Sequence, residues 1–305
     1  MIKKIFFFFL ALAVPFLGLA AGTTSAILGL NPLAYDAGLD IACYAGSESL
    51  ENLVYNPAGG MTGHAIGLSG GVMGLDMNYF SLAYNGRSPF SRSMSLGALV
   101  KYMGTGSVDG LDENGAATGS ISPSDLAVSA IAGWQINKQI GMGTRIYVVQ
   151  EKMSDKSTGY GFDLGASWKM NLMKNTSFRA GLTALNVYSR LWDITEPVGL
   201  GAGLLFDTEF SGMSGLEYGL GLKMDKDEFF EAGGGVRFSS RIKLGTGGLD
   251  YKIGAGYYYS DTSDALQGLR AGLLLGFLKN FNLGYDLLLR PWGTENRISV
   301  SYNIQ

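Results

Sequence analysis

Apolar and polar residues alternate along most of the chain from about residue 65 to the end. In the segment 281–290, every second position is apolar: Phe281, Leu283, Tyr285, Leu287 and Leu289. The positions between them hold Asn282, Gly284, Asp286 and Arg290, together with one leucine. Successive side chains of an extended chain point to opposite faces. The pattern therefore predicts a β-strand with one apolar face and one mostly polar face.

The same alternation recurs in fourteen segments, and no amphipathic helix interrupts them. The predicted strands are 65–73, 77–85, 94–103, 126–136, 139–149, 159–170, 177–187, 198–206, 215–225, 229–238, 249–259, 268–278, 281–290 and 297–304. Most have about the length that a tilted strand needs to cross a bilayer. An even number of consecutive alternating strands is typical of a closed membrane barrel.

The charged residues follow the alternation. The apolar faces contain no Asp, Glu, Lys or Arg, whereas the opposite faces carry all of the charges in the strands. Arg or Lys on a lipid-facing strand at mid-bilayer costs about 2–4 kcal/mol, so lipid around the apolar face would exclude charge from it. We therefore predict an all-β transmembrane antiparallel barrel whose lumen is lined by Arg145, Glu217, Arg237, Arg270, Asp286, Arg290 and Arg297.

A soluble β-sandwich also separates apolar from polar faces, and two further features favour the membrane barrel. The apolar faces carry aromatic residues with a polar tip, often near strand ends, which is typical of an interfacial girdle: Tyr102, Trp134, Tyr160, Trp168, Tyr218, Tyr251, Tyr257, Tyr259, Tyr285 and Tyr302. The polar faces are rich in glycine, which leaves room inside a wall: Gly141, Gly143, Gly199, Gly201, Gly203, Gly233 and Gly235.

The connections alternate between the two ends of such a barrel. With a periplasmic amino terminus, the connections at 137–138 and 279–280 are periplasmic and short, and the long stretch 104–125 and the stretch 291–296 are extracellular. The stretch 239–248 is predicted to be a periplasmic connection, and it is longer than periplasmic turns usually are.

The amino terminus has the features of a secretory signal peptide. Lys3 and Lys4 precede an apolar run from Ile5 to Leu19, which is too short to span a bilayer as a helix. Gly18 and Ala20 place small residues at the positions that signal peptidase reads. We expect cleavage near Ala20 or Ala21 and an outer-membrane location for the mature protein. The net charge of −3 gives no broad basic surface for nucleic acid, and the single cysteine, Cys43, excludes an internal disulfide.

Residues 22–64 do not alternate and precede the barrel. They end in Asn56-Pro57-Ala58-Gly59, whose chemistry is that of a turn. A small-residue lead, a tyrosine and NPAG ahead of a long barrel resemble the amino-terminal region of the FadL superfamily, in particular the PorV/PorQ-type outer-membrane proteins and their uncharacterised spirochaete relatives. Loose glycine-rich likenesses continue at 122–134, 159–170, 178–192 and 269–289. The resemblance implies that 22–64 is a plug, or hatch, with Asn56, Pro57, Ala58 and Gly59 in it, and it likewise implies fourteen strands; the chain departs from outer-membrane barrels in ending on Ile304-Gln305.

No catalytic, cofactor or metal site is predicted. His64 is the only histidine, and a lone histidine beside a turn is typical of ordinary polar surface rather than of catalysis. The acidic stretch with Asp109, Asp112, Glu113 and Asp125 lacks EF-hand spacing, so a solvated loop is favoured over a calcium site.

Three functions remain open at this level. The resemblance implies either transport of hydrophobic or amphipathic small molecules through a plugged lumen, or, by similarity to PorV, a protein-interaction barrel that serves type IX secretion and cargo attachment. A barrel that only occupies the membrane is the third. All three have outer-membrane lipid as a partner.

Overall fold

The computed structural model describes residues 27, 33–34, 38–46, 50–59, 63–73, 77–111, 117–153, 155–191, 198–211, 213–225, 230–244, 247–260, 268–277, 280–290 and 293–304. The predicted signal peptide, residues 1–21, lies outside the described residues. No helix within the described part of the chain is long and apolar enough to cross a membrane.

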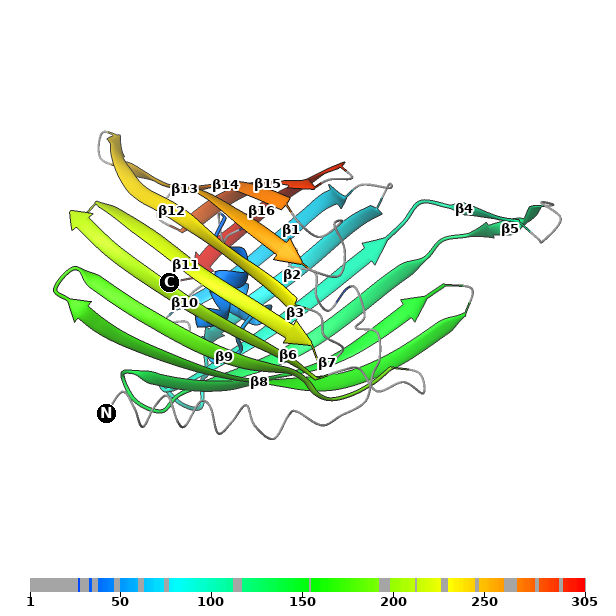
Figure 1. The fold of residues 1–305 in the computed structure, drawn as a ribbon, viewed down its shortest axis with the longest axis horizontal. Coiled ribbons are helices and arrows are strands. Elements are labelled where there is room, and N and C mark those ends of the chain that lie inside the picture. Colours follow the sequence, from blue (N-terminus) through cyan, green and yellow to red (C-terminus); the bar gives the residue numbers. More distant parts are fainter. Residues whose placement is uncertain are drawn as a thin grey trace.

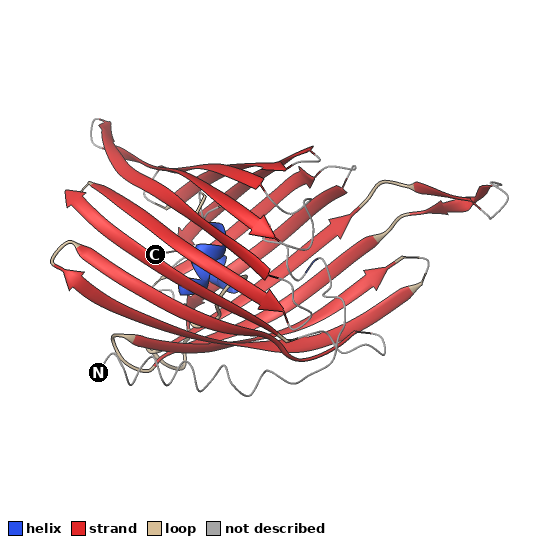
Figure 2. Cartoon of the chain, viewed as in Figure 1, coloured by secondary structure: helices blue, strands red, loops and turns tan. Residues whose placement is uncertain are grey.

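Fourteen antiparallel strands form a closed barrel (Figures 1 and 2). Each barrel strand pairs with the next barrel strand along the chain, β3 with β6 included, and β1 closes the ring by pairing with β16. The barrel strands are β1 (His64–Met73), β2 (Met77–Arg87), β3 (Met94–Gly104), β6 (Ser124–Gln135), β7 (Ile140–Lys152), β8 (Lys156–Met173), β9 (Thr176–Leu191), β10 (Gly199–Ser211), β11 (Ser214–Asp225), β12 (Phe230–Leu244), β13 (Gly247–Ser260), β14 (Gly268–Phe277), β15 (Phe281–Arg290) and β16 (Gly293–Ile304).

The predicted all-β barrel of fourteen strands is confirmed, because every predicted segment overlaps one barrel strand. The alternation missed one element. The stretch 104–125 contains a hairpin of β4 (Val108–Leu111) and β5 (Ala117–Ile121), which projects beyond the barrel from β3 and β6 (Figure 1). These strands are short and glycine-rich, so they lack the alternation that marks the barrel strands.

Two predicted connections are shorter than expected. β12 continues to Leu244 and β13 begins at Gly247, so the long connection at 239–248 was wrong and only 245–246 lie between the strands. β16 begins at Gly293, which reduces the predicted loop 291–296 to 291–292. β16 begins with small and polar residues, and in β12 the polar Ser240 interrupts the apolar face before Ile242. In both places the pairing with the neighbouring strand continues.

The strand order defines the two ends of the barrel. We call the end where β1 begins and β16 ends the turn end; the connections there are 88–93, 136–139, 174–175, 212–213, 245–246 and 278–280. We call the other end the loop end, and the β4–β5 hairpin belongs to it.

The outer surface of the barrel is apolar. Leu220 in the middle of β11 is 67% exposed, and Ile146 on β7, Val236 on β12 and Ile253 on β13 are also exposed. Most of the tyrosines and tryptophans assigned to the apolar face are exposed as well. An apolar belt around a closed barrel needs hydrocarbon around it, since water does not tolerate so large a continuous apolar surface.

The pairing of β8 with β9 contains a bulge. Phe162 pairs with Tyr188 and Leu164 with Ala184, so one residue of β8 opposes three residues of β9. Asn186, inside this bulge, has a φ of 52°, a conformation that asparagine adopts more readily than most residues. The bulge turns the Asn186 side chain towards neighbouring polar groups inside the wall.

Candidate functional site: the inside of the barrel

A segment of chain lies inside the barrel. We call the described residues 33–34, 38–46 and 50–59 the inner segment; it includes the short 3-10 helices η2 (Asp40–Ala45) and η3 (Leu50–Leu53). These helices lie within the ring of strands (Figures 1 and 2). The inner segment is almost entirely buried, and Cys43 is 1% exposed.

Inward-facing glycines let the backbone of the inner segment lie directly on the wall. A Cβ on Gly235 would overlap the carbonyl oxygen of Gly38, and one on Gly221 would overlap the carbonyl oxygen of Ile41. Further along, a Cβ on Gly203 would overlap the backbone nitrogen of Ala45.

The same contact continues through the NPAG turn. A Cβ on Gly181 would overlap the carbonyl oxygen of Tyr44, one on Gly165 would overlap the Asn56 side chain, and one on Gly143 would overlap Pro57. We call Gly143, Gly165, Gly181, Gly203, Gly221 and Gly235 the glycine track. It crosses β7, β8, β9, β10, β11 and β12 in order, so the inner segment follows the barrel wall around its circumference.

Asn56 organises the turn. Its side-chain nitrogen donates hydrogen bonds to the carbonyl oxygens of Tyr44 (2.8 Å) and Ala166 (3.1 Å), and its side-chain oxygen accepts one from the backbone nitrogen of Ala58 (2.9 Å). The backbone nitrogen of Gly59 donates to the carbonyl oxygen of Asn56 at 3.2 Å. The amide thus joins the turn, η2 and β8, which is more than the local turn that its sequence predicts.

Side chains of the wall hold the inner segment by its carbonyl oxygens. Arg145 on β7 donates from Nη1 to the carbonyl oxygens of Leu53 (3.0 Å) and Val54 (2.6 Å). Thr183 on β9 donates to the carbonyl oxygen of Tyr55 at 3.0 Å. On the opposite side of the ring, the backbone nitrogen of Ala34 donates to Ser299 of β16 at 2.8 Å.

Arg145 is itself fixed by a buried ion pair. Its Nε and Nη2 lie 2.5 Å from Asp163 Oδ2 on the paired strand β8, where Asp163 is fully buried. The second carboxylate oxygen accepts a hydrogen bond from the backbone nitrogen of Asn186 (2.7 Å), whose side chain accepts one from Tyr147 (2.6 Å). The β9 bulge therefore supplies the donor that completes the coordination of this carboxylate.

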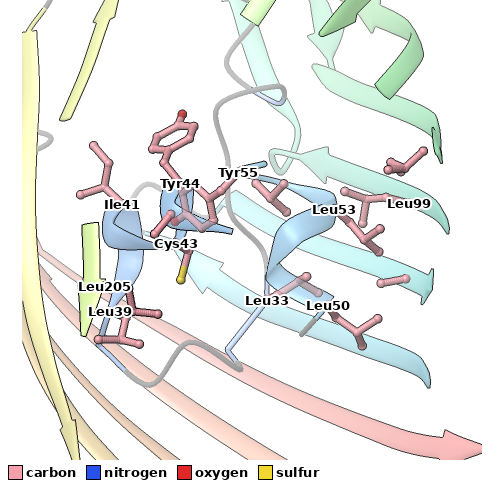
Figure 3. Packing of buried hydrophobic residues seen from close by; sticks show 14 of the residues in the cluster. Leu33, Leu39, Ile41, Cys43, Tyr44, Leu50, Leu53, Tyr55, Leu99 and Leu205 are labelled. Carbon is pink, nitrogen blue, oxygen red and sulfur yellow. The ribbon is translucent and has the colours of Figure 1, made fainter. Parts of the chain in front are cut away.

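Apolar contacts also hold the inner segment against the barrel wall. Figure 3 shows Leu33, Leu39, Ile41 and Leu53 of the inner segment with two wall residues, Leu99 and Leu205. Ile131 and Leu185 of the wall belong to the same buried cluster. Tyr44 and Tyr55 meet edge to face, with ring centroids 5.2 Å apart.

The remaining predicted lumen residues form ion pairs of their own. Arg237 Nη2 lies 2.6 Å from Glu217 Oε2 on the neighbouring strand. Arg270 pairs with Asp286, and Arg297 Nη2 lies 2.6 Å from Glu295 Oε1. The backbone of Arg290 ends β15, but its side chain lies outside the described part of the structure.

The sequence predicted that Arg145 lines the lumen, but it did not predict the contacts of Arg145 with the inner segment. Arg270 and Asp286, both predicted to line the lumen, bind each other, and on that wall the backbone nitrogen of Ala34 donates a hydrogen bond to Ser299. Thr183 and Ser299 were not singled out. Their role depends on a backbone carbonyl or amide brought close by the fold, and no motif marks such a contact.

His64, at the start of β1, lies beside a tyrosine of β2. His64 Nδ1 lies 2.9 Å from the Tyr84 hydroxyl. Among the described residues, no three His, Cys, Asp or Glu side chains are placed to hold a metal ion.

The fold matches that of outer-membrane hydrocarbon channels of the FadL type. No family model matches the chain, and no curated protein matches its sequence. The toluene transporter TodX of Pseudomonas putida is 13% identical, with a TM-score of 0.57 over 87% of this chain and 98% of that chain. The CymD monoaromatic hydrocarbon channel is 13% identical, with a TM-score of 0.56 over 92% and 98%. A Pseudomonas aeruginosa FadL homologue is 8% identical, with a TM-score of 0.54 over 88% and 98%. At these identities the similarity establishes the fold.

Proposed function

We propose that the protein is an outer-membrane channel for hydrophobic or amphipathic small molecules, with residues 22–64 as its plug and residues 1–21 as a signal peptide. In this proposal Asn56, Pro57, Ala58 and Gly59 fix the plug, and Arg145, Glu217, Arg237, Arg270, Asp286, Arg290 and Arg297 line the lumen around it. The shared fold with a toluene transporter and a monoaromatic hydrocarbon channel supports this class of solute.

One observation carries the proposal. The inner segment occupies the lumen without joining the sheet: its described contacts are hydrogen bonds, apolar packing and close backbone approach to glycine. Such contacts can be exchanged for others one by one, so the segment can move without opening the barrel. A pure membrane scaffold would have no need for a wall fitted to a separate segment.

Uptake into whole cells tests the solute class, since hydrophobic compounds cross simple lipid vesicles unaided. The full chain is expressed in a Gram-negative host that lacks its own channel for such compounds, and uptake of radiolabelled toluene and oleate is compared with uptake of a polar sugar. We expect faster uptake of the hydrophobic solutes than in cells with an empty vector, and no change for the sugar. Equal uptake of all three solutes with and without folded protein would contradict the proposal.

Cargo attachment in type IX secretion, our second hypothesis, has no observation on the described residues in its favour. Affinity purification of the detergent-solubilised barrel from its native membrane tests it directly. Stoichiometric recovery of secreted proteins would replace the channel proposal.

A further inference from the structure

The connections at the two ends of the barrel differ in charge. In the sequence, the six connections of the turn end contain no Asp or Glu but contain Arg92, Lys138, Lys174 and Lys279. The connections of the loop end contain one basic residue, Lys226, and many acidic ones: Asp76, Asp109, Asp112, Glu113, Asp155, Asp193, Glu196, Asp227, Glu228, Asp261 and Asp264. Successive connections of an antiparallel barrel lie at alternate ends, so the strand order assigns these residues to the two ends.

The described basic residues of the turn end are free to meet a partner. Arg92, Lys138 and Lys174 are all exposed, and no ion pair involves them within the described part of the chain. They come from three different connections, between β2 and β3, β6 and β7, and β8 and β9. They thus form part of a basic rim that follows the barrel edge.

Large apolar side chains stand beside this basic rim. Phe90 is 87% exposed within the same connection as Arg92, and Ile136 is 56% exposed two residues before Lys138. Met173, 74% exposed, immediately precedes Lys174. Exposed apolar residues beside cations, in turns too short to leave the membrane boundary, match an interface where acyl chains meet charged headgroups.

We propose that the turn end is a binding surface for anionic phospholipid headgroups. Arg92, Lys138 and Lys174 bind the phosphates, and Phe90, Ile136 and Met173 insert among the adjacent acyl chains. The absence of carboxylates from these turns removes the repulsion that an anionic headgroup would otherwise meet, whereas the acidic loop end repels the same lipids. This inference does not depend on what the barrel transports.

Lipid selectivity of the reconstituted full chain tests the proposal. Electron paramagnetic resonance measures the association of nitroxide-labelled phosphatidylglycerol with the barrel, relative to labelled phosphatidylcholine. A basic side chain near an anionic surface contributes a factor of about five in binding, so we expect a preference of several-fold for phosphatidylglycerol at low salt. High salt should reduce it, because exposed charges are screened.

Matched variants assign the preference to the turn end. The triple variant Arg92→Gln, Lys138→Gln, Lys174→Gln should lose it, whereas Lys152→Gln with Lys156→Gln, which removes two exposed cations at the loop end, should keep it. Heat-modifiable migration on gels confirms that each variant is folded.

Three results would overturn the proposal: no preference in the natural chain, a preference that survives the triple variant, or equal loss in both variants.

A further control uses polyglutamate. Salt-sensitive binding of this polyanion through Arg92, Lys138 and Lys174, without any lipid preference, would identify the surface as a docking site for an acidic protein instead.

Discussion

At the scale of single residues, Arg145 connects the wall to the inner segment. One guanidinium contacts Asp163 and the carbonyl oxygens of Leu53 and Val54. Lysine cannot reproduce this set, since its compact ammonium lacks the planar fork. The residue therefore links the stability of the barrel to the seating of the segment.

Replacing Arg145 with alanine should both weaken the barrel and release the inner segment. Asp163 would lose its hydrogen-bonded partner, and removing one member of a buried ion pair costs about 3–5 kcal/mol. The only cysteine, Cys43, reports the release, because it is buried in the inner segment of the folded protein. We expect its labelling by a maleimide to accelerate about tenfold or more, the factor that corresponds to ~1.4 kcal/mol.

A matched variant separates release from general destabilisation. Leu220→Arg perturbs the outer face of β11, and it should leave Cys43 protected while it lowers the unfolding free energy to a comparable degree. Equal labelling rates for Arg145→Ala and Leu220→Arg would show that Arg145 has no specific role in holding the segment.

The glycine track gives a second test at this scale. Gly221→Ala or Gly143→Ala places a Cβ against Ile41 or Pro57 of the inner segment, so the backbone of the segment must shift away from the wall. Cys43 labelling should therefore accelerate. Gly106→Ala is the control, because a Cβ at Gly106 meets nothing within 4 Å; if it exposed Cys43 as much as the track variants, the fit of segment to wall would not matter.

At the scale of elements, each barrel strand has a lipid face whose tolerance for charge depends on depth. Leu220 lies in the middle of β11, and Phe90 lies in a turn. Arg at mid-bilayer costs about 2–4 kcal/mol, but only about 0–1 near the interface.

Leu220→Arg should consequently destabilise the barrel by about 2–4 kcal/mol, and Phe90→Arg by about 1 kcal/mol or less. Reversible denaturant titration in lipid vesicles, monitored by tryptophan fluorescence, measures both. A similar small cost at the two positions would place β11 outside the hydrocarbon.

The inner helices η2 and η3 behave differently from the strands. Each is too short to be stable alone, so they exist only because the wall packs against them. Their sequence accordingly carries no periodic signal, whereas the strands, which bury one face each, alternate clearly.

At the scale of the whole molecule, barrel closure and lumen occupancy are separate properties. In the described part of the chain, all strand pairings, including β1 with β16, lie within residues 64–304. Deleting residues 22–60 should thus leave a heat-modifiable barrel that lacks the inner segment.

This deletion should give a large, stable conductance in planar bilayers, where the full mature chain should give little. The double variant Gly143→Ala, Gly221→Ala provides a full-length comparison and should show intermediate or fluctuating currents. Unchanged conductance in both proteins would contradict the plug role of the inner segment.

The sequence by itself determined the barrel. Lipid requires an uncharged outer face, and a strand can supply one only if its apolar residues recur with a period of two. The number of strands and the face on which each charge lies could therefore be read from the alternation. The sequence analysis did not find the short β4–β5 hairpin or the early start of β16 at Gly293, where small and polar residues show no such period. It also missed the extension of β12 to Leu244, where Ser240 interrupts the apolar face.

Only the tertiary structure decided what the inside of the barrel holds. The sequence showed the glycines of the polar faces as positions without a side chain. Their contacts with Gly38, Ile41, Tyr44 and Pro57 could not be predicted, because these residues are distant from the glycines in sequence. The same holds for Arg145, whose partners Leu53 and Val54 offer backbone oxygens that every residue possesses. Close approach of backbone to backbone leaves no side-chain signature, so it appears only when the ring of strands is closed.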